Sequence, residues 1–130
     1  MGFALTIDLE RPFGEVLAAT RGALAASGFG IVSEIDLQKT LRDKIGVDVG
    51  EHVILGACNP RYAQRGLEIE PSLGVLLPCN VVVRHSAGLT VVEAIDPETM
   101  VMVTENPAMA DLADEVRQAL KQALDQVSAS

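Results

Sequence analysis

The sequence predicts an α+β fold, in which a mostly antiparallel sheet carries helices packed on one face. Several segments alternate apolar and polar residues with the period of two that is typical of half-buried strands. Two other segments repeat apolar residues at helical spacing, and the longer of them comes at the end of the chain. The predicted order is β-α-β-β-(short α)-β-β-α, which indicates one sheet and one helical layer. Because no internal repeat or linker interrupts this order, we expect residues 1–130 to form a single domain.

The first part of the chain predicts a strand, a helix and a second strand. Residues 3–9 alternate, and Pro12 suits the first turn of the helix that follows them. Gly28 suits the left-handed position that ends such a helix. Residues 42–51 are polar and contain glycine, which predicts a short helix or a loop. Between Gly28 and this stretch, alternation places four side chains on one face of the second strand: Ile31, Ser33, Ile35 and Leu37.

The middle of the chain predicts two further strands with a short helix between them. Residues 52–58 alternate weakly and end at Asn59, a good helix N-cap, and Pro60, a good first helical residue. Residues 75–83 are apolar on both faces, so we expect this strand to lie centrally or to be covered on both sides. Pro78 marks either a bulge or the true start of that strand, because it cannot donate to the ladder.

The last part of the chain predicts one strand and one long helix. Residues 89–95 form the strand, whereas residues 96–103 fit either a helical turn or an extended segment. The helix opens at Asn106 and Pro107, which repeat the capping pattern seen earlier in the chain. Its apolar stripe consists of Met109, Leu112, Ala113, Val116, Leu120, Ala123, Leu124 and Val127.

Composition restricts the partners that we expect. The 130 residues are 48% hydrophobic and 22% charged, which suits a soluble globular protein. The net charge of −8 repels phosphate backbones and anionic lipid headgroups, so we expect neither nucleic acid nor a membrane as a partner. Aromatic residues make up only 3% of the chain, which leaves few platforms for base stacking. With no basic leader segment at its start, the chain is expected in the cytoplasm, with reduced thiols.

The two cysteines, Cys58 and Cys79, are each followed by asparagine and are the first candidate site. A register that pairs Cys58 with Cys79 on neighbouring antiparallel strands would also pair His52 with His85. The two pairs would then lie about 20 Å apart, at roughly 3.3 Å per strand residue, so a shared zinc site is not expected. We therefore predict no metal site and no cofactor.

Two interpretations of the thiols stay open. Cys58 precedes a capped helix start, where the helix dipole favours a thiolate, and Cys79 would be its resolving partner. In the other interpretation both cysteines simply pack as small apolar residues, which is the commoner role of free cysteine. Asn59 and Asn80 are candidates for hydrogen bonds to a ligand, although Asn59 is also the expected helix cap.

Two weaker candidate groups lie outside the Cys-Asn segments. Glu34 and Asp36 share a strand face and could line a polar pocket or act as acid and base, but such residues are more often a solvated sheet face. Three methionines and the two cysteines could be soft ligands for Cu(I), yet apolar methionines are more often core filler. The methionines concerned are Met100, Met102 and Met109.

The segments "EIDLQKTL", "ILGACNP", "GVLLPCNVVV" and "AIDP" resemble the domain of unknown function 302 family. The likeness extends over nearly the whole chain, and the two Cys-Asn segments in this order carry most of it. It implies a small bacterial or archaeal protein with an α+β arrangement like that of the TATA-box-binding protein. It also implies a homodimer. The likeness to a DNA-binding protein concerns the fold alone, and the family has no established activity.

Three functions remain as hypotheses, and no catalytic motif decides whether the protein is an enzyme. The first is a homodimeric binding module with a groove for a small apolar or mixed ligand near Cys58 and Cys79, which the surplus of aliphatic residues favours. The second is a thiol redox protein that uses the same two cysteines. The third is a purely structural or assembly protein, in which these segments serve the dimer interface.

Overall fold

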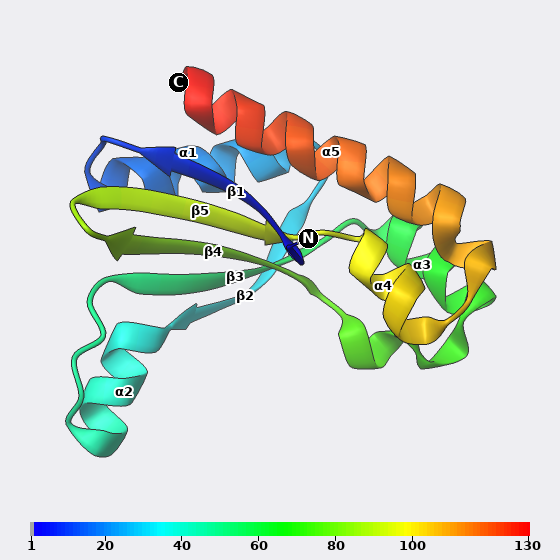
Figure 1. Ribbon diagram of the computed structural model, residues 1–130, viewed down its shortest axis with the longest axis horizontal. Coiled ribbons are helices and arrows are strands. Elements are labelled where there is room, and N and C mark those ends of the chain that lie inside the picture. The colour runs from blue at the N-terminus through cyan, green and yellow to red at the C-terminus, as the bar shows by residue number, and fades with distance from the viewer. Residues whose placement is uncertain (1) are drawn as a thin grey trace.

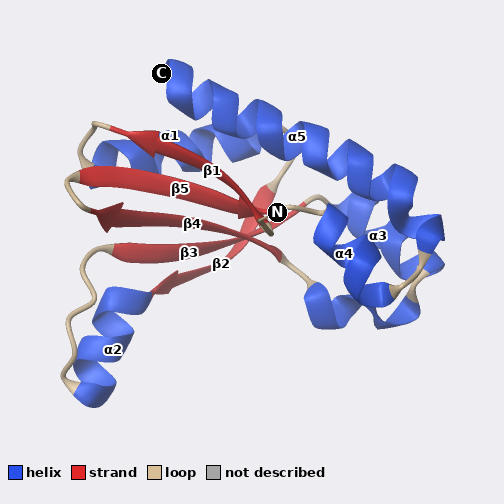
Figure 2. Cartoon of the chain, viewed as in Figure 1, coloured by secondary structure: helices blue, strands red, loops and turns tan. Residues whose placement is uncertain are grey.

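The computed structural model describes residues 2–130 and contains one five-stranded sheet (Figures 1 and 2). Every pair of neighbouring strands is antiparallel, and the strand order is β1-β5-β4-β3-β2. The strands are β1 Ala4–Leu9, β2 Gly30–Asp36, β3 His52–Cys58, β4 Cys79–Ser86 and β5 Leu89–Ile95. The α+β fold class with an antiparallel sheet is therefore confirmed.

Among the described residues, five α-helices and two short 3₁₀ turns connect and cover these strands. The helices are α1 Phe13–Ala26, α2 Leu37–Ile45, α3 Pro60–Ile69, α4 Glu98–Thr104 and α5 Ala110–Ala129, and the turns are η1 Pro71–Leu76 and η2 Pro107–Met109. The helix α4 occupies a stretch that the sequence pattern left open between a helical turn and an extended segment. The helix α2 begins at Leu37, so the expectation that Leu37 lies on the second strand is wrong; Asp36 ends β2 and caps α2. Within residues 2–130, no helix is both long enough and apolar enough to cross a bilayer.

The core lies between one face of the sheet and the helices α1 and α5 (Figure 1). Leu55, Val81 and Ala94 occupy one row across β3, β4 and β5, and each is at most 1% exposed. The predicted apolar stripe of the terminal helix faces this row and is buried throughout. The side chains of the central strands are the most completely buried, because the helical layer removes most of their apolar surface from water.

The second strand departs from simple alternation because it contains a bulge. Ile31 pairs with Ala57, but Ser33 pairs with Gly56, so Val32 is an extra residue without a partner of its own. Ile31 therefore faces the helices with Ala57, whereas Ser33 lies on the opposite face of the sheet. The expectation that Ile31 and Ser33 share a face is wrong, because one inserted residue reverses every side chain beyond it.

The face of the sheet opposite α1 and α5, which we call the open face, is not covered by a helical layer. Ile35, Ile54 and Val82 form an apolar row across β2, β3 and β4 on this face, and Ile35 is 45% exposed. The helix α2 projects beside this face and has no buried residue (Figure 1). The loop after it leaves further apolar side chains exposed, namely Val47 and Val49. The open face therefore offers apolar surface to a partner.

Gly56 of β3 lies on the open face, where Ser33 of β2 and Pro78, just before β4, approach it closely. A Cβ atom placed on Gly56 would meet Ser33 Oγ and would lie 2.8 Å from Pro78 Cγ. Real Cβ atoms do not approach other heavy atoms so closely, so this position requires the absence of a side chain. Pro78 itself precedes β4, which begins at Cys79, so the interpretation of Pro78 as marking the strand start is correct.

Candidate functional site

The structure corrects the predicted register of the two cysteines by one residue. Cys79 pairs with Ala57, and Cys58 lies one position beyond that pair. Because successive side chains of a strand point to opposite faces, the two thiols lie on opposite faces of the sheet. The second expected pair is wrong for the same reason, since His52 pairs with Arg84 and not with His85.

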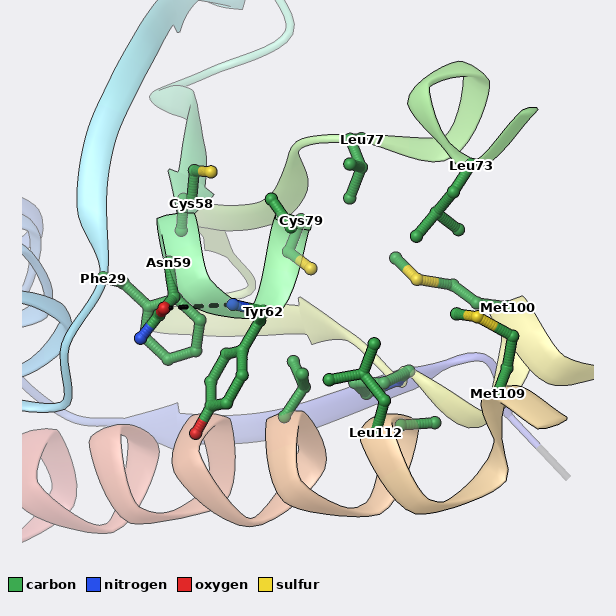
Figure 3. A pocket seen from close by; sticks show the side chains of 15 residues that line it. Phe29, Cys58, Asn59, Tyr62, Leu73, Leu77, Cys79, Met100, Met109 and Leu112 are labelled. Carbon is green, nitrogen blue, oxygen red and sulfur yellow. Dashed lines mark hydrogen bonds between the residues drawn. The ribbon is translucent and has the colours of Figure 1, made fainter. Parts of the chain in front are cut away.

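This geometry weakens the thiol redox hypothesis. A disulfide needs Cβ atoms about 3.5–4.5 Å apart with side chains that point toward each other. Cys58 and Cys79 point away from each other across the sheet, and both are free (Figure 3). A bond between them would require a large backbone movement in two central strands.

Cys79 faces the helical layer and is only 7% exposed. Burial, with a smaller contribution from the neighbouring Cys58, raises the pKa of the Cys79 thiol to about 11. The thiol is consequently protonated at neutral pH and is a weak nucleophile in the free protein. Cys58, in contrast, is half-buried.

Cys79 lines an apolar pocket of about 40 Å³ between the sheet and three helices, and Cys58 also contributes to the lining of this pocket (Figure 3). Tyr62 of α3, Met100 of α4 and Leu112 of α5 contribute walls to this pocket. The Phe29 and Tyr62 rings lie 6.3 Å apart at 53°, a tilted contact that closes one side. None of the described residues that line the pocket has a charged side chain. The pocket therefore suits an occupant of low polarity.

Asn59 has a structural role at the edge of this pocket. Its side-chain Oδ1 accepts hydrogen bonds from the backbone N–H groups of Arg61 at 2.9 Å and Tyr62 at 3.3 Å. These bonds start α3 in the predicted way, and they orient Tyr62 toward the pocket (Figure 3). Asn80 does not reach the pocket, because it is exposed on the open face opposite Gly56.

Glu34 and Asp36 lie away from the pocket, and each already has a partner. Both Glu34 carboxylate oxygens accept hydrogen bonds from the Arg21 guanidinium, at 2.7 and 2.8 Å. The Asp36 carboxylate accepts from the backbone N–H of Lys39 at 3.0 Å and caps α2. The two carboxylates share a strand face, as expected, but the structure brings neither of them to the cysteines.

The aromatic walls of the pocket are the residues that the sequence patterns missed. The chain contains three Phe and one Tyr, and two of these four rings line one pocket. The scarcity of aromatic residues was the signal that could have identified these two, because a bulky ring occupies a large part of any site that it lines. Phe29 follows the left-handed Gly28 directly, and Tyr62 follows the Asn59 cap by three residues.

Four sulfur-containing residues line the pocket, and they come from four separate elements: Cys58 of β3, Cys79, Met100 and Met109. Cys79 begins β4, Met100 is in α4, and Met109 ends the turn η2. Met102, the third methionine considered with them, is 60% exposed and lies outside the pocket. Over residues 2–130 there is no group of three or more His, Cys, Asp or Glu residues that could hold a metal ion.

The fold and the pocket together define an antiparallel α+β protein with a small apolar pocket between its sheet and its helices. The chain belongs to the family described as Domain of unknown function DUF302, whose model matches residues 5–127. It is similar to an uncharacterized conserved protein DUF302 from Bacillus stearothermophilus, known from a crystal structure. The two share 28% sequence identity and a TM-score of 0.92 over 98% of this chain and 99% of that chain. None of the curated proteins matches the chain.

Proposed function

We propose that this protein is a binding module that holds a small ligand of low polarity in the pocket beside Cys79. The observation that carries the proposal is the pocket itself, which is mostly apolar and adjoins the first Cys-Asn segment and Cys79. Binding pockets in proteins are mostly apolar concavities with few polar groups, and this pocket has that character. We propose further that residues 1–130 act as one domain in the cytoplasm, where both thiols stay reduced.

The size of the pocket limits its ligand. An engineered cavity that binds benzene or xenon has a volume of about 150 Å³. The pocket here is about 40 Å³, so it accepts an atom-sized occupant directly and a larger one only if a wall moves. Met100 and Met109 are the adaptable wall residues, because unbranched methionine side chains change rotamer readily.

Xenon is expected to enter this pocket in crystals of the protein under xenon pressure, and Ala113→Leu is expected to abolish its density there. Ala113 of α5 lines the pocket and is 6% exposed, so a leucine would fill the space at a cost of about 1–3 kcal/mol in stability. The matched control is Ala129→Leu, because Ala129 is exposed on the same helix. Xenon density that is absent from the parent protein, or unchanged in Ala113→Leu, would contradict a binding function and favour a purely structural role.

We propose that the binding module is a homodimer and that the open face is its interface. Ile35, Ile54 and Val82 give this face an apolar row, and the projecting α2 stands beside it (Figure 1). A second copy would remove this surface from water, which is the main driving force for such association.

Sedimentation velocity is expected to give the mass of two chains, and Ile54→Lys is expected to shift the protein to one chain. An unpaired charge buried in an interface costs about 3–5 kcal/mol, so the dimer should weaken by more than about 100-fold. Leu67→Lys is the control, because Leu67 is 42% exposed on α3 and outside the open face. A parent protein that sediments as one chain would refute the dimer and leave the pocket proposal standing.

A further inference from the structure

Of the three helices that wall the pocket, α4 has the weakest attachment to the rest of the chain. Met100 is its buried residue, and the Met100 side chain extends into the pocket (Figure 3). Among the described residues, no hydrogen bond or ion pair joins residues 98–104 to another helix, strand or turn, and the Thr104 hydroxyl donates within α4 itself. The helix α3, in contrast, is joined to α5 by the ion pair of Arg65 with Glu115 at 2.6 Å.

The turn η1 also contributes to the pocket, but close packing holds it in place. Its Leu73 is 2% exposed, and a Cβ atom on Gly66 of α3 would collide with the Leu73 side chain. Movement of η1 would therefore separate two closely fitted surfaces, whereas movement of α4 would remove mainly Met100 from its contacts.

The residues that flank α4 are fixed to other elements. Before the helix, the Asp96 backbone N–H donates to the Phe3 carbonyl at 2.8 Å, and the Asp96 carboxylate accepts from the Arg117 guanidinium at 3.3 Å. After the helix, the Asn106 side-chain amide donates to the Ile69 carbonyl at 3.3 Å. A segment that is fixed at both ends, and held between them by little buried surface, can move as one unit.

The backbone is strained where α4 ends. Glu105 has a φ of 52°, in the left-handed region. This conformation is uncommon for residues other than glycine, because the Cβ atom crowds the backbone. The Glu105 side chain is exposed, so burial does not account for this conformation. Strained residues of this kind often mark segments that move during function, and this one lies at the end of the weakly attached helix.

We propose that α4 is a movable lid over the pocket, and that its displacement admits an apolar ligand about the size of a benzene ring. The inference rests on the proposed function, because it names the wall that moves and the size of ligand for the same pocket. The closed pocket is about 40 Å³. A cavity that holds benzene is about 150 Å³, so such a ligand needs the lid displaced.

The sequence of α4 suits a lid. Residues 100–103 are four consecutive apolar residues, so the helix offers an apolar side chain to a ligand in more than one orientation. Val103 also borders a surface groove whose other side includes Val75 of η1. These two side chains are 60% and 85% exposed. A shift of α4 into this groove removes part of that apolar surface from water, which offsets contacts that Met100 loses.

Amide hydrogen exchange, followed by mass spectrometry, tests the lid through two opposed substitutions of Glu105. Valine is branched at Cβ and disfavours a positive φ, whereas asparagine tolerates it. We expect Glu105→Val to accelerate exchange in residues 98–104 by about tenfold, and Glu105→Asn to slow it. Both substitutions replace an exposed side chain, so both variants should fold. If the valine variant fails to fold, the asparagine variant still tests the opposite direction.

Benzene binding, measured by NMR titration, should follow the same equilibrium. When only the displaced form binds a ligand, the apparent affinity rises in proportion to the fraction of that form. Glu105→Val should therefore bind benzene more tightly than the parent protein by the same factor that it accelerates exchange, and Glu105→Asn more weakly. Xenon fits the closed pocket, so its binding should be the same in both variants.

Ala87 provides the matched control. It has a φ of 50° and lies in the exposed turn between β4 and β5, at the other end of the sheet from α4 (Figure 1). Ala87→Val adds the same kind of backbone strain there, so it should change neither exchange in residues 98–104 nor benzene affinity. Equal effects of Ala87→Val and Glu105→Val would overturn the lid, because they would reflect a general loss of stability.

The probes distinguish failure of the lid from failure of the pocket. Benzene that binds with the same affinity in the parent protein and both Glu105 variants would mean that another wall moves, and would overturn the lid. Xenon binding without benzene binding in any variant would also overturn the lid, and would leave the pocket standing. Absence of both xenon and benzene would refute the pocket as a binding site.

Discussion

Cys79 is expected to react with iodoacetamide at least about 100-fold more slowly in the folded protein than in urea. Only the thiolate reacts, and burial raises the pKa of Cys79 from 9.0 to about 11, so the thiolate fraction falls by about 100-fold near neutral pH. Restricted access adds to this effect, because the side chain is 7% exposed. Mass spectrometry of the two cysteine peptides after timed quenching measures both rates.

The same measurement tests the thiol redox hypothesis. The half-buried Cys58 should provide the fast phase of alkylation, so Cys58→Ser should remove that phase and Cys79→Ala should leave it intact. The reaction of Cys79 should keep accelerating as the pH rises toward about 11. Fast alkylation of both cysteines, or a disulfide between them under mild oxidation, would contradict the geometry and restore the redox interpretation.

Leu55→Ala is expected to lower the free energy of unfolding by about 2–5 kcal/mol. Leu55 is in the central part of β3, is fully buried, and lies in one row with Val81 under the helical layer. Truncation there removes transfer free energy and leaves a cavity that rigid neighbouring strands cannot close. Urea unfolding followed by circular dichroism measures the change.

Leu67→Ala is the matched control for this substitution, because it makes the same chemical change at a position that is 42% exposed. Its effect should stay within about 0.5 kcal/mol, as for other surface substitutions. An equal loss of stability in both variants would mean that the sheet row is not the centre of the core.

The sequence was informative where local chemistry decides the structure. Asn59 and Pro60 start α3 as their capping chemistry predicts, and Gly28 has the positive φ of 89° expected after α1. The stripe from Met109 to Val127 is buried because helical spacing alone fixes which residues share a face. Fold class followed from the order of such locally determined elements.

The sequence was not informative where the structure depends on the register in which two strands pair. Cys58 could pair with Cys79 or lie one residue beyond it, and both registers satisfy the local alternation of these apolar strands. The bulge at Val32 is similar, because nothing in the polarity of Ile31 or Ser33 announces an inserted residue. The candidate site depended on these non-local choices, so its position near Cys79 could be predicted but not which side chains would meet there.

The close approach at Gly56 has a consequence for how related sequences can diverge. Ser33 and Pro78 occupy the volume that a side chain at position 56 would need. Replacement of Gly56 alone therefore forces one of these two neighbours to move, whereas positions 33 and 78 are not restricted in the same way by Gly56. Divergence at this corner of the sheet is expected to be correlated, with a larger residue at position 56 accompanied by changes at position 33 or 78.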